Sequence, residues 1–112
     1  MLDIQMDRTR SFPVAKLSGA LSGLDADQLS EALGEPPYGE EARIAIDLSG
    51  LKSIDSNGLA VLIAVVTRSR LTHGRVVLVA PSPFVAGVLS VTRLDRWFDV
   101  STDLAGAEKL LL

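Results

Sequence analysis

Two short apolar runs, separated by a longer segment with a helical pattern, constrain the fold of this chain most strongly. Residues 43–48 and 75–80 are almost continuously apolar, which is typical of strands covered on both faces. The intervening segment 56–73 is long enough for a helix that opens at Ser56 and stops near Gly74. Two strands of one sheet joined by a crossover helix are parallel, and the crossover is right-handed. The centre of the fold is therefore predicted to be a parallel sheet.

The flanking segments extend this pattern. Apolar and polar residues alternate over 2–7, which predicts a strand, and a second strand is predicted at 12–17. The short turn between these segments predicts antiparallel pairing. The other predicted elements are a short helix from Asp25 with apolar anchors including Leu24 and Leu29, its stop at 34–39, a helix capped by Ser82, a strand at 97–100 and a terminal helix capped by Ser101 or Thr102. The order β-β-α-β-α-β-α-β-α predicts an α/β fold with a mixed, mostly parallel sheet in one domain, residues 1–112.

Composition excludes several classes of function. The chain has 112 residues, which is enough to bury a core without disulfides or metals. It has no cysteine, which excludes thiolate zinc sites and cysteine nucleophiles, and its net charge of −3 argues against nucleic-acid binding. The longest apolar run, 59–66, is too short to cross a bilayer, and the charged residues in 1–10 do not suit a signal peptide. We expect a cytoplasmic protein with no cofactor and no membrane insertion.

The most informative segment is Asp55-Ser56-Asn57-Gly58, at the start of the long helix. A predicted loop at 49–55 connects the preceding strand to this helix start. Binding sites of parallel sheets lie at such carboxyl ends of strands. Ser56 is predicted to cap the helix through its hydroxyl, and Gly58 to keep the first turn uncrowded. The helix N-terminus would tolerate a phosphate on Ser56, which adds about −1.5 to −2 charges. From the pattern alone, simple capping is the commoner interpretation of Ser56.

The segment Asp47-Leu-Ser-Gly-Leu51, followed by Asp55-Ser-Asn-Gly-Leu59, resembles the signature of STAS domains, especially bacterial anti-sigma factor antagonists. Weaker similarities extend over nearly the whole chain, at 17–19, 79–82 and 94–100. The resemblance implies a STAS-like fold and a regulatory binding protein that is not an enzyme. It also implies that an anti-sigma factor serine kinase binds the unphosphorylated protein and phosphorylates Ser56, and that a serine phosphatase restores the hydroxyl.

The same resemblance implies a set of residues around the acceptor. Asp55, Asn57 and Gly58 would frame Ser56 for the partner kinase. Ser22 departs from the family pattern, because many such antagonists carry an acidic residue at this place. Asp25, three residues later, is expected to compensate for that departure.

The helix that follows Ser56 carries apolar residues on two faces. Steps of about 100° per residue place Leu59, Leu62, Ile63 and Val66 toward the core. The opposite face then holds Asn57, Val61, Ala64, Val65 and Arg68. An outward face this apolar predicts a partner surface, with Val61 and Val65 as contacts. The alternatives are that another element covers this face or that small exposed valines have no role.

Two other functions are alternatives to the regulatory one. A hydrolase or transferase with Ser56 as nucleophile would need a base, but the only histidine, His73, lies about 25 Å along the same helix. No glycine-rich phosphate loop or histidine-based metal cluster is present in the sequence. A STAS subunit of a bacterial lipid-transport ATPase stays open as an alternative, because it would dock through the same serine loop and helix.

Overall fold

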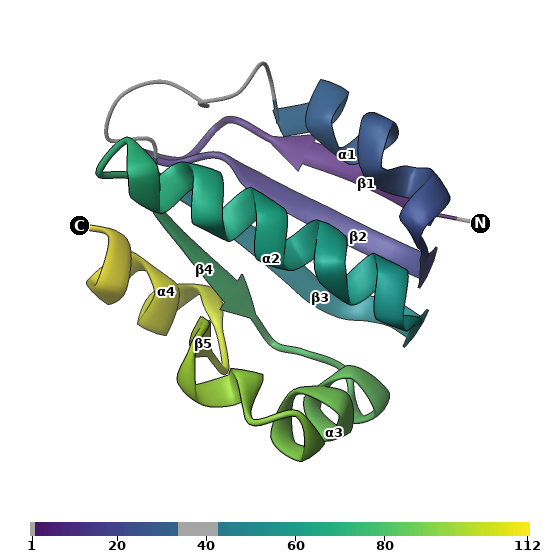
Figure 1. Ribbon diagram of the computed structural model, residues 1–112. Helices are drawn as coiled ribbons and strands as arrows, with labels where there is room; N and C mark the ends of the chain where they lie inside the picture. Colours follow the sequence, from purple (N-terminus) through teal and green to yellow (C-terminus); the bar gives the residue numbers. More distant parts are fainter. Residues whose placement is uncertain (1, 34–42) are drawn as a thin grey trace.

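The computed structural model describes residues 2–33 and 43–112, and its centre is one five-stranded sheet (Figure 1). The strands are β1 (Leu2–Asp7), β2 (Val14–Leu21), β3 (Arg43–Ile54), β4 (Arg75–Val79) and β5 (Asp99–Ser101), and they lie in sequence order across the sheet. β1 pairs antiparallel with β2, and the other three pairs are parallel. The predicted mixed, mostly parallel sheet is confirmed. The predicted helix stop at 34–39 lies outside the described residues.

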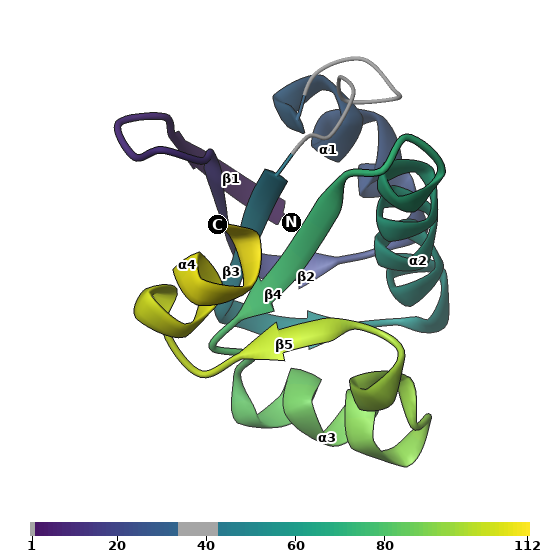
Figure 2. The same ribbon diagram turned by 90° about the vertical axis from the view of Figure 1, so that its left-hand side faces the viewer.

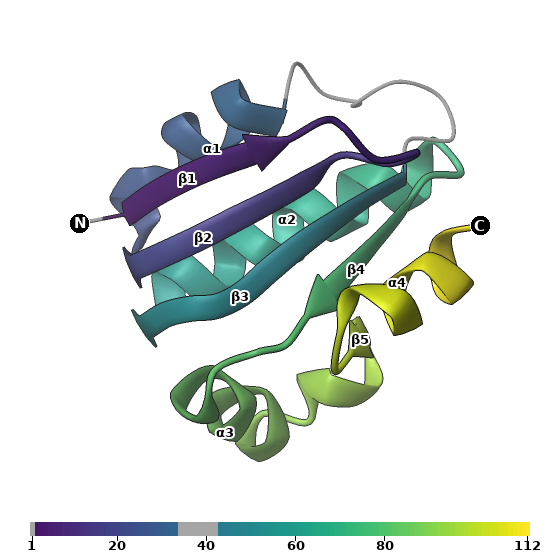
Figure 3. The ribbon, with the colours of Figure 1, turned by 180° about the vertical axis from the view of Figure 1, so that it is seen from behind.

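Helices cover both faces of the sheet. They are α1 (Ala26–Leu33), α2 (Ser56–Leu71), α3 (Pro83–Val91) and α4 (Leu104–Leu111), with single 3₁₀ turns η1 (Gly23–Asp25) and η2 (Leu94–Arg96). α1 and α2 lie over one face, and Figure 2 shows α4 on the opposite one. The larger core cluster fills the space under α1, α2 and α3, whereas a smaller one lies between α4 and the central strands. Seen from behind, β1 and β2 have no described helix over them (Figure 3).

β2 and β3 are longer at their carboxyl ends than the sequence predicted. β2 starts at Val14 and runs past Gly19 to Leu21, while β3 continues to Ile54 through the predicted loop. Leu51 and Ile54 are buried and pair with Gly19 and Leu21, so burial and pairing together hold this polar segment in the sheet. Gly19 has a φ of 91°, which glycine adopts without strain, and a register shift between the strands follows it.

Several predicted helix ends are also corrected. The cap of α4 is Asp103, whose carboxylate accepts a hydrogen bond from the Gly106 N–H at 2.7 Å, and neither Ser101 nor Thr102 takes this role. α2 ends one residue before Thr72, and the left-handed residue that stops it is His73, with a φ of 61°, instead of Gly74. Gly74 contributes its N–H, which donates to the carbonyl of Ser69 at 2.8 Å.

Ser69 on α2 provides a stability test of the core beneath this helix. Its side chain is fully buried, and its hydroxyl has no hydrogen-bond partner. Ser69→Ala removes this unpaired polar group and places a better helix former at the same position. We expect the free energy of unfolding to rise by about 1 kcal/mol, measured by urea denaturation followed by circular dichroism. A lower stability would mean that the hydroxyl has a partner in solution.

Candidate functional site

The start of α2 is capped by Asp55. The Asp55 backbone is extended, and its Oδ1 accepts a hydrogen bond from the Gly58 N–H at 2.6 Å. The prediction that Ser56 caps the helix is therefore wrong. Aspartate is a preferred N-cap, and its negative charge is also favourable at the positive end of the helix dipole. Ser56 is the first helical residue, its side chain is exposed, and its hydroxyl makes no hydrogen bond to any described residue.

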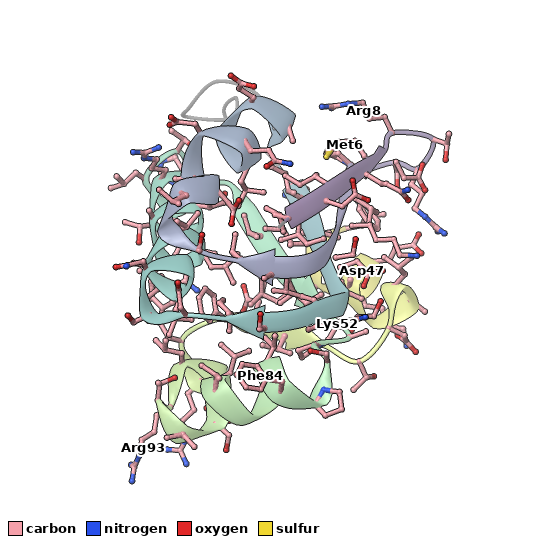
Figure 4. All side chains as sticks on the ribbon, turned by 90° about the vertical axis from the view of Figure 1, so that its right-hand side faces the viewer. Met6, Arg8, Asp47, Lys52, Phe84 and Arg93 are labelled. Atoms are coloured by element: carbon pink, nitrogen blue, oxygen red, sulfur yellow. The ribbon has the colours of Figure 1, made fainter. Side chains whose placement is uncertain are left out.

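The loop after β2 packs directly against this helix start. A Cβ atom added to Gly58 would lie 2.2 Å from the carbonyl oxygen of Leu21, and one added to Gly23 would lie 2.8 Å from the Cβ of Asn57. The Asp55 N–H also donates to the carbonyl of Leu21 at 3.3 Å. Two segments that are more than 30 residues apart in sequence thus form one continuous surface. Figure 4 views the side of the molecule where β2 and β3 end, with Lys52 labelled near the end of β3.

The two polar residues predicted in the loop after β2 contact each other. The N–H of Ser22 donates to Oδ2 of Asp25 at 2.8 Å, and its hydroxyl donates to the same oxygen at 3.1 Å. The N–H of Asp25 returns a hydrogen bond to the Ser22 carbonyl at 3.0 Å. These bonds close the turn η1, which packs against α2. That Asp25 compensates for Ser22 in partner recognition stays a prediction.

The outward face of α2 is only partly as predicted. Val61 is half-buried, but Val65 is 3% exposed and belongs to the core, so its placement on an outward face is wrong. The physical reason is that η1 and α1 pack along this side of α2. What remains open is a shallow groove between them, lined by Gly23, Ala26, Asn57, Ala60, Val61, Ala64, Val65 and Arg68. We call this the α1–α2 groove.

One exposed residue near this site, Leu24, lies where the sequence pattern did not predict it. Leu24 was expected to anchor the first helix in the core, but its side chain is 95% exposed. Leu29, by contrast, is fully buried and anchors α1. Leu24 lies in η1, between a glycine and the first turn of α1, where helical periodicity does not apply. The glycine directly before it was the available sign that this leucine precedes the helix.

Arg70 and Arg75, two of the basic residues at or just after the end of α2, have structural partners. The Arg70 guanidinium lies 4.4 Å from the centre of the Trp97 ring and donates to the Trp97 carbonyl at 2.6 Å. Arg75 pairs with Asp99 at 3.1 Å.

Within residues 2–33 and 43–112, no three His, Asp or Glu side chains gather in a way that could hold a metal ion. No helix in this part of the chain is both long and apolar enough to span a membrane.

The fold and the exposed Ser56 at the start of α2 together indicate a small α/β domain of the STAS type. The chain belongs to the STAS domain family, because the family model described as "Mlab, STAS domain" matches residues 4–109. The resemblance noted in the sequence is thereby confirmed.

Known relatives agree with this assignment. The chain is 28% identical over 106 residues to BtrV of Bordetella bronchiseptica, whose name places it among anti-sigma factor antagonists, and the match covers 95% of this chain and 91% of BtrV. An anti-sigma factor antagonist from Mycobacterium paratuberculosis has a similar structure, with a TM-score of 0.78, 24% identity and coverage of 99% and 94%. The phosphorylated form of SpoIIAA from Bacillus has a TM-score of 0.71, 21% identity and coverage of 96% and 99%. These structures establish the fold.

Proposed function

We propose that this protein is an anti-sigma factor antagonist that binds a serine-kinase anti-sigma factor and is switched off by phosphorylation of Ser56. The observation that carries the proposal is the division of labour at the start of α2. Asp55 caps the helix, so the exposed Ser56 hydroxyl has no structural bond to lose on modification. The similarity to BtrV and the existence of a phosphorylated form of SpoIIAA support the same role.

The switch would act through charge and bulk at the contact surface. A phosphoserine at the first helical position is favourable for the helix itself, because it lies at the positive end of the dipole. The domain would therefore stay folded in both states. A partner docked over Ser56, Asn57 and Val61 would meet a dianion next to the Asp55 carboxylate. A serine phosphatase would reverse the change, and the whole cycle would take place in the cytoplasm.

Phosphorylation can be tested with the purified protein, a candidate kinase-type anti-sigma factor, ATP and magnesium. We expect mass spectrometry to detect one added phosphate, located on Ser56 by peptide fragmentation. Ser56→Ala should abolish the modification, because no other acceptor lies at the start of α2. The nearby exposed Ser53 is the internal control, since it lies on β3 and outside the helix start. Phosphate on Ser53 or on any other residue would contradict the proposal.

The phosphorylation assay and co-purification together separate the proposal from the alternative, the STAS subunit of a lipid-transport ATPase. Such a subunit would use the same loop and helix for a permanent contact, so its Ser56 would stay unmodified. Stable co-purification with an ATPase, together with no phosphate on Ser56, would favour that alternative. The relevant neighbouring genes would then encode lipid transport proteins instead of a kinase.

A further inference from the structure

Leu24 is the most exposed large apolar side chain among the described residues. It lies in the middle of η1, the turn that contacts the start of α2. Single exposed apolar residues are common on proteins, so exposure alone says little. Leu24 differs because it is next in sequence to Gly23, which lines the α1–α2 groove and packs against Asn57.

The turn that carries Leu24 is held in place by specific contacts. Both the N–H and the hydroxyl of Ser22 bond to the Asp25 carboxylate, which closes the turn on either side of Leu24. Gly23 packs against Asn57 so closely that no side chain fits between them. The leucine is therefore presented on a fixed turn that packs against the start of α2. A partner that buries it would lose little conformational entropy in ordering the turn.

The charges around Leu24 indicate what kind of partner surface fits it. Asp25 and Asp27 follow Leu24 closely in sequence, Asp55 precedes the helix that η1 contacts, and the segments 22–28 and 55–60 contain no lysine or arginine. An apolar residue with an acidic border is complementary to an apolar pocket with basic side chains at its rim. A second copy of this chain would bring acidic residues against acidic residues at this surface. Charge complementarity therefore favours a different protein.

We propose that Leu24 is a specificity-determining contact that inserts into a basic-rimmed apolar pocket of the anti-sigma factor kinase. This inference rests on the proposed function and adds a recognition residue to it. Ser56 supplies the modified group, whereas Leu24 supplies apolar binding energy beside that group.

The test is the steady-state kinetics of Ser56 phosphorylation by the kinase that modifies the wild-type protein. Leu24→Ser should raise KM for the protein substrate by at least about tenfold and leave kcat unchanged, because the lost contact is equal in the ground and transition states. Leu71→Ser is the matched control. Leu71 is also exposed, at 77%, but it lies at the opposite end of α2, so its removal should leave both constants unchanged.

The outcomes separate this inference from the proposed function. If the wild-type protein is not phosphorylated on Ser56, the proposed function fails and the role of Leu24 fails with it. If Ser56 is phosphorylated but Leu24→Ser has the KM of the wild type, only the Leu24 inference is overturned. The remaining possible occupant is a second copy of this chain. Sedimentation velocity of both variants, compared with the wild type, tests for it. A Leu24-dependent dimer with an unchanged KM would assign Leu24 to self-association and overturn the kinase contact.

Discussion

Gly58→Ala is expected to destabilise the domain by about 2–3 kcal/mol. The added methyl group would lie 2.2 Å from the carbonyl oxygen of Leu21 and 2.7 Å from its carbonyl carbon, so the backbone of β2 or of α2 must move. The better helix propensity of alanine recovers only about 1 kcal/mol of this cost. Thermal unfolding followed by circular dichroism should show a melting temperature lower by roughly 8–15 °C for a chain of this size.

The matched control is Gly87→Ala in α3. Gly87 is also a helical glycine, but a Cβ atom built on it meets nothing within 4 Å. Alanine should therefore stabilise this helix, by about 0.5–1 kcal/mol, through propensity alone. The two substitutions are chemically identical and are expected to have opposite signs. A Gly58→Ala protein that melts at or above the wild-type temperature would show that α2 and β2 do not approach as closely as described.

Local sequence patterns could predict some parts of the fold and not others. The two continuous apolar runs and the helix between them were predicted correctly, because buried parallel strands and a long helix have strong local patterns. The end of β3 was missed, because Lys52 and Ser53 are exposed and break the apolar pattern between the buried Leu51 and Ile54. Its pairing with β2 is a tertiary contact that local composition does not encode.

The candidate site shows the same division. The segment 55–58 was correctly placed at a helix start, but both Asp55 and Ser56 are good caps, and periodicity alone does not choose between them. Helical spacing put Val61 and Val65 on one face correctly. It could not show that α1 and η1 cover Val65, because the position of one element against another depends on long-range packing. Leu24 was misassigned for a local reason, because it lies in η1, before α1 begins, where helical periodicity does not apply.

Ser56→Asp is expected to weaken binding of the kinase by more than about a hundredfold, equivalent to roughly 3 kcal/mol. The substituted carboxylate mimics part of the phosphate charge and lies next to the Asp55 carboxylate at the exposed start of α2. Ser56→Ala should bind like the wild type, because the Ser56 hydroxyl makes no hydrogen bond to the described part of the protein. Isothermal titration calorimetry with the purified kinase measures both affinities.

Ser56→Asn separates charge from size in the same experiment, since asparagine has nearly the shape of aspartate without its charge. If charge drives the switch, Ser56→Asn should bind within a few-fold of wild type while Ser56→Asp does not. All three variants should keep the wild-type melting temperature, because Asp55 still caps α2. Ser56→Asp should exceed it slightly, because an acidic residue in the first turn is favourable. A loss of binding without loss of folding would locate the effect at the contact surface. Equal affinities for the alanine and aspartate variants would mean that charge at Ser56 is not the switch, however readily Ser56 is phosphorylated.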